Sequence, residues 1–269
     1  MRQAPNILTI AGSDSGGGAG IQADLKTIQA LGGYGLTAIT ALTAQNGLTV
    51  RDIFPASAEF IACQIETIED GFPVQAAKTG MLFSAEIIRT VSAKLQDKPF
   101  PLVVDPVAVS QSGCPLLEEE AVKALKETLL PLSDLLTPNI PEAEMLTQMT
   151  IQNADDIQEA GARLLSMVGG AVLIKGGHLP NAILVTDYLF EPSTPPREMP
   201  KPFIDTKNTH GTGCTLSAAI ATFLGFGLPL SVAVSKAQDF LNLALRKSYA
   251  PGKGAGPCNH ACLNMESNS

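Results

Sequence analysis

Positively charged side chains are scarce in this chain. Its 269 residues include 18 Lys and Arg against 26 Asp and Glu, which gives a formal net charge of −8 at pH 7. Nucleic acids and anionic membrane surfaces attract basic proteins, so this balance argues against either as a partner. A small phosphorylated ligand is still compatible with the composition, because binding it requires only a few local positive groups.

Long uninterrupted apolar runs are also missing. The most hydrophobic stretch, from Thr215 to Val234, is broken by two Gly and by Pro229, so it predicts two packed helices with a turn between them rather than a membrane span. The first residues contain no apolar signal core. The five Cys are an odd number in a long chain, which favours reduced thiols, and we therefore expect a cytoplasmic protein.

Two familiar phosphate-binding patterns are absent. No G-x-x-x-x-G-K-[ST] occurs, so the chain is not a P-loop protein, and the G-x-G that begins at Gly211 has Leu216 where a dinucleotide fingerprint has its third Gly. Trp is absent and aromatic residues are few, but a hydrophobic content of 45% is enough for a sizeable core. No repeat and no linker is visible, and we expect a single domain over residues 1–269.

The most informative stretch runs from Asn208 to Leu216, where a polar loop leads directly into an apolar helical pattern. Gly211 and Gly213 have no side chains, so a ligand can approach the backbone closely. The first N–H groups of the following helix have no partners within the helix and carry the positive end of its dipole. The stretch therefore predicts a phosphate site beside Cys214, with an ordinary glycine-rich helix start as the alternative.

Strands and helices alternate along the chain, which predicts an α/β fold with a mainly parallel sheet and helices on both faces. We expect strands at residues 6–11, 34–43, 102–107 and 182–190. We also expect a short strand with its exit loop at 76–81, a strand, loop and helix start over 135–142, and a strand over 171–178 that ends in a Lys and two Gly. We expect helices at residues 21–31, 57–70, 84–95, 118–130, 154–168, 216–224 and 231–246, with a further helix starting near residue 142. The Pro-rich residues 192–202 are expected to form a surface excursion.

Polar residues stand at the carboxyl ends of several expected strands, where open α/β sheets bind ligands. Asp105 closes an apolar strand before Pro106 and is either a turn residue or a metal-associated carboxylate. Asn139 and Glu142 have a spacing that fits an Mg²⁺ and phosphate site and fits a helix capping box equally well. Lys175 is placed to meet a phosphate, or it extends from a strand end into solvent.

The glycine-rich residues 12–20 follow the first strand and form either a ligand-contacting loop or a flexible surface loop. Asp24, one turn into the next helix, faces this loop or complements the helix dipole. Gln45 is placed to bind a polar ring, with an Asn-Gly turn as the alternative. Met81 either lines a pocket or packs in the core.

Together these motifs resemble a known family, the bacterial hydroxymethylpyrimidine/phosphomethylpyrimidine kinases of the ribokinase-like superfamily. The resemblance runs from Asn6 to His260 and lies in five blocks that occur in the family's order. The blocks are Ala11–Thr27, Thr40–Asn46, Thr137–Glu144, Lys175–His178 and Asn208–Ser217. It implies a three-layer αβα sandwich and ATP-dependent phosphorylation of 4-amino-5-hydroxymethyl-2-methylpyrimidine and then of its monophosphate, for thiamine synthesis.

The resemblance also implies a role for each candidate residue. The pyrimidine would meet Gln45, Asp24, Gly12, Met81 and Val107. Mg²⁺ would be held by Asp105 and Glu142, and ATP by Asn139, Lys175, Gly211, Thr212 and Gly213. The catalytic set would be Gly211, Gly213, Cys214 and Lys175. A thiol stands at position 214, where sugar-kinase relatives have an Asp. Because a helix N-terminus lowers the pKa of a thiol, a thiolate base is one expectation, and a pocket-shaping role is the other.

Three further possibilities follow from the sequence. Pyridoxal kinase is the first alternative function, since it also phosphorylates a hydroxymethyl group on a nitrogen ring. A non-catalytic pyrimidine-binding domain is the second, and it predicts binding without ATP turnover. Cys258, His260 and Cys262 could form part of a Zn²⁺ site, although no partner cluster is visible and the fit of residues 256–260 to the family argues against it. From the family we also expect a homodimer.

Overall fold

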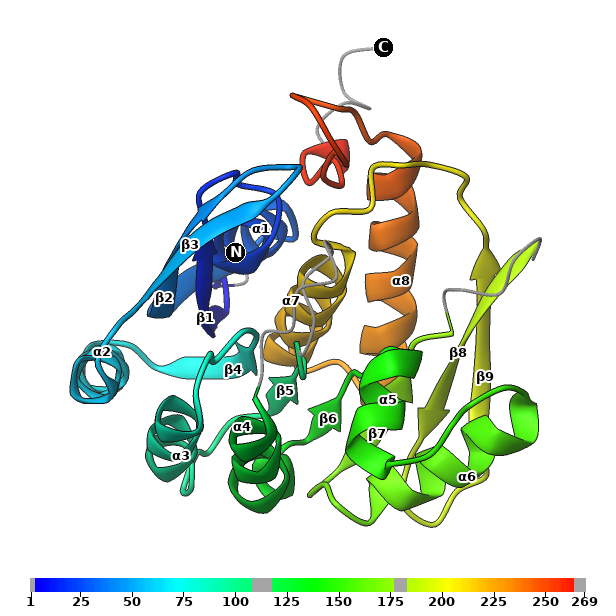
Figure 1. The fold of residues 1–269 in the computed structure, drawn as a ribbon, viewed down its shortest axis with the longest axis horizontal. Helices are drawn as coiled ribbons and strands as arrows, with labels where there is room; N and C mark the ends of the chain where they lie inside the picture. The colour runs from blue at the N-terminus through cyan, green and yellow to red at the C-terminus, as the bar shows by residue number, and fades with distance from the viewer. Residues whose placement is uncertain (1–2, 108–117, 177–182, 264–269) are drawn as a thin grey trace.

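The computed structural model describes residues 3–107, 118–176 and 183–263. Within them, a nine-stranded sheet has the order β3-β2-β1-β4-β5-β6-β7-β8-β9 (Figure 1). The strands are β1 (Asn6–Asp14), β2 (Tyr34–Gln45), β3 (Val50–Pro55), β4 (Val74–Thr79), β5 (Leu102–Val104), β6 (Leu135–Leu136), β7 (Ala171–Ile174), β8 (Leu184–Phe190) and β9 (Arg197–Pro202).

The central part of the sheet is parallel, as expected from the alternation of strands and helices. β2, β1, β4, β5, β6 and β7 form consecutive parallel pairs, and β3, β8 and β9 are antiparallel additions at the two sides. The inner strands β5, β6 and β7 are buried at every position. Continuous apolar strands of this kind are typical of a sheet that is covered on both faces.

Helices cover both faces of the sheet. Figure 1 shows α1, α7 and α8 on one side and α2, α3, α4 and α6 on the other. The helices are α1 (Gly20–Ala30), α2 (Ala58–Gly71), α3 (Ala85–Lys94), α4 (Glu119–Ala124), α5 (Ile140–Thr147), α6 (Ala154–Leu165), α7 (Thr212–Gly225) and α8 (Leu230–Arg246). α4 continues directly into a π turn, Leu125–Leu129, and a 3₁₀ turn, Leu130–Leu132, which together match the single helix expected at 118–130.

The core is divided by the sheet into two clusters of buried side chains. Successive residues of β1 point to opposite faces, so Ile7 joins the cluster under α1, α7 and α8, and Leu8 joins the cluster under α2, α3 and α6. Both side chains are fully buried. Burial on both faces fixes the register of the sheet. The register in turn determines where along the sheet the loop after each strand begins.

The strand order places a topological switch point between β1 and β4. The chain leaves β1 toward β2 on one side, and it later returns to add β4 on the other side of β1. The connections therefore diverge at the carboxyl ends of β1 and β4, where open α/β sheets bind their ligands. The loops after residues 14 and 79 leave the sheet at this point.

Two strands differ from the sequence-based expectations. Residues 197–202, within the predicted surface excursion over 192–202, form the mostly exposed edge strand β9, which was not expected. Pro200 and Pro202 are tolerated because β9 pairs only with β8, and its other side has no ladder that requires their missing N–H groups. β3 was not expected, because its mostly exposed residues do not follow an inward and outward alternation.

No helix in the described ranges combines the length and the low charge that a bilayer crossing requires.

Candidate active site

The start of α7 presents two unpaired backbone donors. Gly211 caps the helix in the left-handed region, with φ of 77°. Thr212 N donates to Thr209 O at 3.3 Å and Thr215 N donates to Gly211 O at 2.9 Å, but the amides of Gly213 and Cys214 between them have no acceptor within the described ranges. Unpaired amides at a helix N-terminus are the donors that bind phosphate. The geometry agrees with the phosphate site that the sequence predicts.

A lysine and two carboxylates lie directly beside this helix start. Lys175 Nζ is 3.1 Å from Asp105 Oδ1 and 3.9 Å from Glu142 Oε2. A Cβ atom added to Gly213 would lie 3.4 Å from Asp105 Oδ2 and 3.6 Å from Lys175 Nζ. Asp105, Glu142, Lys175 and Gly213 therefore lie close together. They come from the ends of β5 and β7 and from the starts of α5 and α7.

The charges in this cluster stabilise one another. Burial alone would lower the pKa of Lys175, but the carboxylates of Asp105 and Glu142 outweigh burial and raise it. Lys175 is therefore a cation throughout the neutral range. Asp105 also accepts from Thr137 Oγ1 at 3.3 Å and from Ser217 Oγ at 3.3 Å, and its side chain is only 2% exposed. The carboxylate is consequently fixed in orientation.

Asn139 and Glu142 form a complete capping box at the start of α5. Asn139 Oδ1 accepts from Glu142 N and Glu142 Oε2 accepts from Asn139 N, both at 2.8 Å. The backbone of Lys175 bonds to this segment through Pro138 O at 2.8 Å. The capping interpretation of the spacing is thus confirmed, and the Glu142 carboxylate also lies beside Lys175, where the ligand-binding interpretation requires it.

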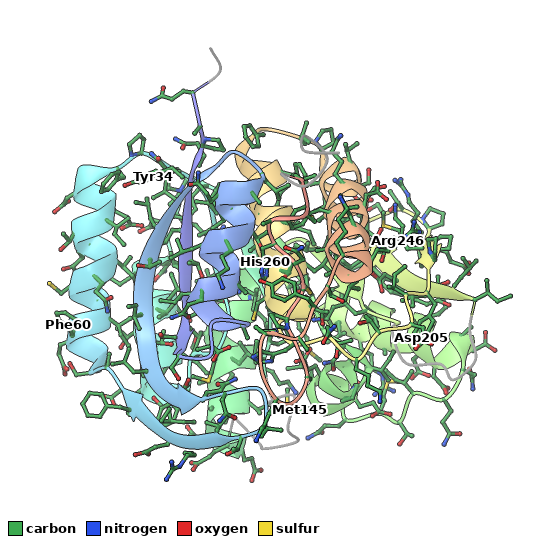
Figure 2. All side chains as sticks on the ribbon, turned by 90° about the horizontal axis from the view of Figure 1, so that it is seen from above. Tyr34, Phe60, Met145, Asp205, Arg246 and His260 are labelled. Carbon is green, nitrogen blue, oxygen red and sulfur yellow. The ribbon has the colours of Figure 1, made fainter. Side chains whose placement is uncertain are left out.

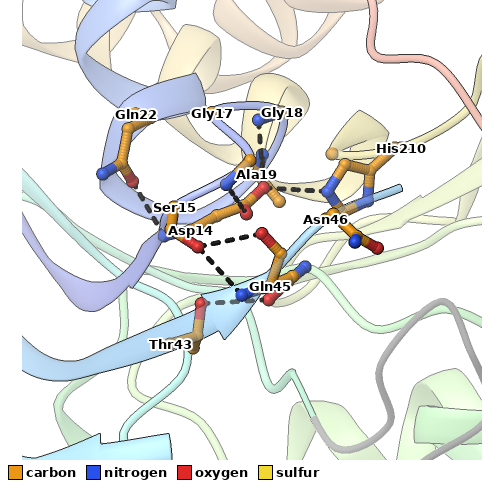
Figure 3. A network of polar contacts seen from close by, with 12 residues as sticks. Asp14, Ser15, Gly17, Gly18, Ala19, Gln22, Thr43, Gln45, Asn46 and His210 are labelled. Carbon is orange, nitrogen blue, oxygen red and sulfur yellow. Dashed lines mark hydrogen bonds and ion pairs between the residues drawn. The ribbon is translucent and has the colours of Figure 1, made fainter. Parts of the chain in front are cut away.

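The glycine-rich loop after β1 is organised by Asp14 (Figure 3). Its Oδ1 accepts from Gly16 N at 2.8 Å, and its Oδ2 accepts from Gly18 N at 3.0 Å and Ala19 N at 2.8 Å. The same Oδ2 lies 2.9 Å from Nε2 of His210, which precedes the α7 turn. The loop is therefore ordered and joined to the phosphate side of the site.

Gln45 ends β2 beside this loop. Its backbone exchanges two hydrogen bonds with the hydroxyl of Ser15, at 2.8 and 2.9 Å, and its Oε1 accepts from Thr43 Oγ1 at 3.3 Å (Figure 3). Its side chain is half-buried. An amide in this position has donor capacity left for a polar ring that enters at the switch point.

Gly12, Met81 and Val107 also gather at the carboxyl ends of β1, β4 and β5. A Cβ atom on Gly12 would lie 2.5 Å from the terminal methyl carbon of Met81, so these two residues are in contact. Val107 shares a small pocket with Asp105 and Gly80. Gly12 and Met81 are thus in contact with each other, and Val107 lies beside Asp105 of the polar cluster.

Asp24 lies deeper than the other candidate substrate residues. It is fully buried, accepts from Thr9 Oγ1 at 2.6 Å, and holds Lys78 Nζ at 3.1 and 3.2 Å through its two oxygens. Burial would lower the pKa of Lys78, but Asp24, Cys214 and Asp105 together outweigh burial and raise that pKa. In this structure Asp24 therefore faces an internal ion pair rather than the open end of the site.

Cys214 is a neutral thiol here. Burial raises its pKa to about 11, against the opposing effect of Lys78, while the carboxylates of Asp24 and Asp105 add to the increase. The raised pKa favours the pocket-shaping alternative for Cys214, and the thiolate base stays a prediction. The helix dipole favours the anion, but the loss of hydration in this half-buried position outweighs it.

The C-terminal Cys and His residues lie next to the first turn of α7. His260 Nε2 is 3.0 Å from Thr215 Oγ1, and the Thr215 hydroxyl in turn donates to Gly211 O at 2.8 Å. Cys258 and Cys262 are both buried. No group of three His, Cys, Asp or Glu side chains in the described part of the chain is arranged to hold a metal ion.

Sequence reasoning missed Asp14, His210 and Lys78. Asp14 and His210 are 196 positions apart, and nothing in the sequence pairs them. Lys78 could have been noticed, because a charged residue inside the apolar strand β4 requires a buried partner. Gly177 and His178, which follow Lys175 in the motif, lie outside the described residues.

Comparisons with known proteins converge on one family. A family model described as phosphomethylpyrimidine kinase matches residues 14–259. The hydroxymethylpyrimidine/phosphomethylpyrimidine kinase of Haemophilus influenzae is 47% identical over 263 residues, which cover 97% of this chain and 98% of that protein. The thiamine biosynthesis bifunctional protein ThiED of Geobacter sulfurreducens is 48% identical over 96% of this chain and 54% of its own length.

A solved structure extends the likeness to the fold. The ADP complex of Bacillus subtilis pyridoxal kinase superposes with a TM-score of 0.89 at 36% identity, and the match covers 98% of this chain and 100% of that one. Together with the parallel sheet and its two helical layers, this match confirms the ribokinase-like three-layer α/β fold that the sequence predicts.

Proposed function

Since this chain belongs to the phosphomethylpyrimidine kinase family, we infer that it is a kinase that uses ATP to phosphorylate 4-amino-5-hydroxymethyl-2-methylpyrimidine, and then the monophosphate, in thiamine diphosphate biosynthesis. The observation that carries this assignment is the pair of unpaired amides at Gly213 and Cys214, which lies beside Lys175 and opposite the loops at the switch point. It offers an anion site next to a pocket for a small ring.

In this proposal the α7 turn binds the phosphoryl group that is transferred. Gly211 and Thr212 form the turn that allows close backbone approach, the amides of Gly213 and Cys214 are the N–H donors, and Lys175 supplies a fixed positive charge. Phosphoryl transfer has a loose transition state with charge spread over the equatorial oxygens, so positioned donors and cations provide most of the catalysis. Asn139, at the start of α5, is bridged to Lys175 through the backbone, which supports a role for Asn139 in binding the ATP phosphates.

Asp105 and Glu142 fit an Mg²⁺ site. Both are buried carboxylates, and both already converge on one cation, the ammonium group of Lys175. Oxygen ligands of this kind, completed by phosphate oxygens and water, are the usual environment of Mg²⁺ in kinases. When bound, the ion would neutralise charge on the phosphate oxygens.

The acceptor ring is proposed to bind between the glycine-rich loop and the end of β4. We propose that Gly12, Met81 and Val107 contact the ring and that Gln45 offers amide hydrogen bonds to its polar edge; the contact between Gly12 and Met81 supports this proposal. We propose that Asp24 supports this pocket indirectly, through its buried ion pair with Lys78. We assign Cys214 a role in shaping the space around the acceptor hydroxyl, because its thiol is neutral at physiological pH.

Pyridoxal kinase activity is the second candidate function. The structural likeness to the Bacillus subtilis pyridoxal kinase favours testing it, since both acceptors present a hydroxymethyl group on a flat nitrogen ring. We expect the pyrimidine to be the better substrate, because the family model and the curated relatives are pyrimidine kinases.

A coupled ADP-release assay tests the assignment with three acceptors: the hydroxymethylpyrimidine, its monophosphate and pyridoxal. We expect turnover with both pyrimidines and a lower kcat/KM with pyridoxal. Gly213→Val should lower kcat at least about 100-fold, because a branched side chain covers the two amides and removing one such donor has costs of this size. Retained turnover in Gly213→Val, or no turnover with either pyrimidine, would reject the proposal.

We further propose that residues 1–269 form one domain, and that the enzyme works as a homodimer in the cytoplasm. β3 is an edge strand of the sheet, and its Phe54 is 72% exposed opposite Leu42, which is 51% exposed. An apolar edge of this kind is a surface that proteins usually cover. The free thiols of the described cysteines fit a reducing compartment.

A further inference from the structure

The contact between Asp14 and His210 joins the two loops that form opposite sides of the site. Asp14 ends β1 on the acceptor side, and His210 lies two residues before α7 on the phosphate side. Their side chains are 3% and 13% exposed, and Nε2 lies 2.9 Å from Oδ2 (Figure 3). Neither residue belongs to the proposed set that contacts phosphate, metal or ring.

The direction of this hydrogen bond follows from the charge of Asp14. Burial alone would raise the pKa of Asp14, but hydrogen bonds from His210, Ala19 and Gly16 outweigh burial and lower it. The carboxylate is therefore ionised and has no proton to donate, so Nε2 of His210 carries the proton. A hydrogen bond to a charged acceptor is stronger than a neutral one, which makes it a suitable fixed link.

The backbones of the two loops are in contact around this bond. A side chain on Gly211 would collide with the carbonyl oxygen of Gly18, and a side chain on Gly18 would collide with the His210 ring. The φ of Gly211 is 77°, which is the conformation that turns the chain into α7. The position of Gly18 therefore limits where Gly211, and with it the unpaired amides that follow, can lie.

We infer that Asp14 and His210 are positioning residues for phosphoryl transfer, and that their contact holds the phosphate-binding turn of α7 at a fixed distance from the glycine-rich loop that covers the acceptor. The inference rests on the proposed function of that turn. The backbone of His210 is already held by Gly256 O at 3.1 Å, so the side chain adds a link that folding of the loop alone does not need.

The alternative is that Asp14 only organises its own loop. Its two oxygens accept from the amides of Gly16, Gly18 and Ala19, and this function is independent of His210. Removal of the His210 side chain distinguishes the two explanations. If the contact positions the α7 turn, loss of the imidazole slows transfer. If Asp14 acts on its own loop alone, loss of the imidazole leaves transfer unchanged.

The experiment measures kcat and both KM values by coupled ADP release for His210→Ala, His210→Gln, Asp14→Asn and the double variant Asp14→Asn/His210→Ala. A thermal melt of each variant verifies folding, and Asp52→Asn is the control, because it removes an exposed carboxylate on β3. We expect His210→Ala to lower kcat about 10- to 100-fold, with the pyrimidine KM within about threefold, because small displacements of a positioned group cost rate rather than binding.

His210→Gln should recover most of the lost kcat, because its side-chain amide can still donate to Asp14. The double variant should be no slower than the slower single variant, since both substitutions break one contact. A kcat of folded His210→Ala within about twofold of the wild type, or losses that multiply in the double variant, would overturn the inference.

The Gly213→Val variant separates this inference from the proposed function. If Gly213→Val is inactive while His210→Ala equals the wild type, the turn binds phosphate and only the positioning role fails. If Gly213→Val keeps its turnover, the phosphate role of the turn fails, and the positioning role fails with it. Should Asp14→Asn not fold, the two His210 variants alone decide, because they leave the amide bonds of the glycine-rich loop intact.

Discussion

At the scale of single residues, Cys214 is subject to two opposing effects. The first turn of α7 favours a thiolate, whereas burial disfavours any anion and dominates, with a resulting pKa of about 11. General bases contribute about 100- to 10,000-fold to rates when their pKa lies near the working pH. A thiol that stays protonated at neutral pH cannot make a contribution of that size.

We therefore predict that Cys214→Ala lowers kcat only about 10-fold or less and leaves the KM for ATP within about twofold, well below the loss of a general base. Steady-state kinetics from pH 6 to 9 is the measurement, and the wild-type kcat should show no rising limb that disappears in the variant. A loss above about 100-fold, together with such a limb, would restore Cys214 as the base.

His260 is the residue whose protonation should affect stability. Burial lowers its pKa from the usual 6.5 to about 4, so the folded chain keeps the ring neutral under conditions where the unfolded chain protonates it. The unfolded state therefore binds more protons between these values. The stability that the neutral ring contributes is complete above pH 6.5 and is lost as the pH falls toward 4.

Urea unfolding at pH 7 and pH 5 checks this effect. The wild type should lose about 2 kcal/mol more than His260→Gln over this interval, because Gln does not titrate. Equal losses in the two proteins would mean that the ring is protonated in the folded state, contrary to its buried contact with Thr215.

At the scale of secondary structure elements, α5 and α6 start with the same motif and provide a matched comparison. Asn139 with Glu142 caps α5 inside the site, and Asn153 with Asp156 caps α6 away from it. The sequence alone cannot separate capping from ligand binding, because both functions use the same spacing.

Substitution of each cap by Ala should separate the two functions. Asn153→Ala should cost about 1 kcal/mol of stability without changing kcat/KM for ATP, whereas Asn139→Ala should cost a similar amount and also lower kcat/KM. Urea unfolding and ADP-release kinetics of the two variants provide the comparison. If activity is the same in both, Asn139 is a cap and nothing more.

The elements that sequence reasoning predicted well are those with a strong pattern. Continuous apolar strands such as Leu102–Val104 and the capped helix α3, which starts after Ser84, agree with the structure because burial and capping act locally. The edge strands β3 and β9 were not predicted, since an edge strand needs no apolar alternation and tolerates Pro.

At the scale of the whole molecule, the site is assembled from segments that are distant in the chain. The topology brings the ends of β1, β4, β5 and β7 to one edge of the sheet, so Asp105 and Lys175 could be expected there from strand order alone. The pairs Asp14–His210 and Asp24–Lys78 could not, because they depend on side-chain geometry between elements, which periodicity does not encode.

The oligomeric state is also a property of the whole molecule. Figure 2 shows Phe60 on the outer side of α2, and its side chain is 61% exposed. Phe54, on the neighbouring edge strand β3, is 72% exposed. We predict that the wild type sediments as a dimer and that Phe54→Glu shifts it toward the monomer, because a buried carboxylate disfavours an apolar interface.

Phe203→Glu is the matched control, since Phe203 is also exposed, at 49%, but lies outside this edge. Sedimentation velocity of the three proteins is the measurement. A monomeric wild type, or a Phe54→Glu variant that remains fully dimeric, would contradict this interface.

The most direct test of the central claim is the structure of the enzyme with a non-hydrolysable ATP analogue, Mg²⁺ and the hydroxymethylpyrimidine. We predict γ-phosphate oxygens within about 3 Å of the amide nitrogens of Gly213 and Cys214, with the acceptor hydroxyl facing them from the glycine-rich loop. A γ-phosphate bound away from the α7 turn, or a turn whose amides are occupied by protein groups, would contradict it.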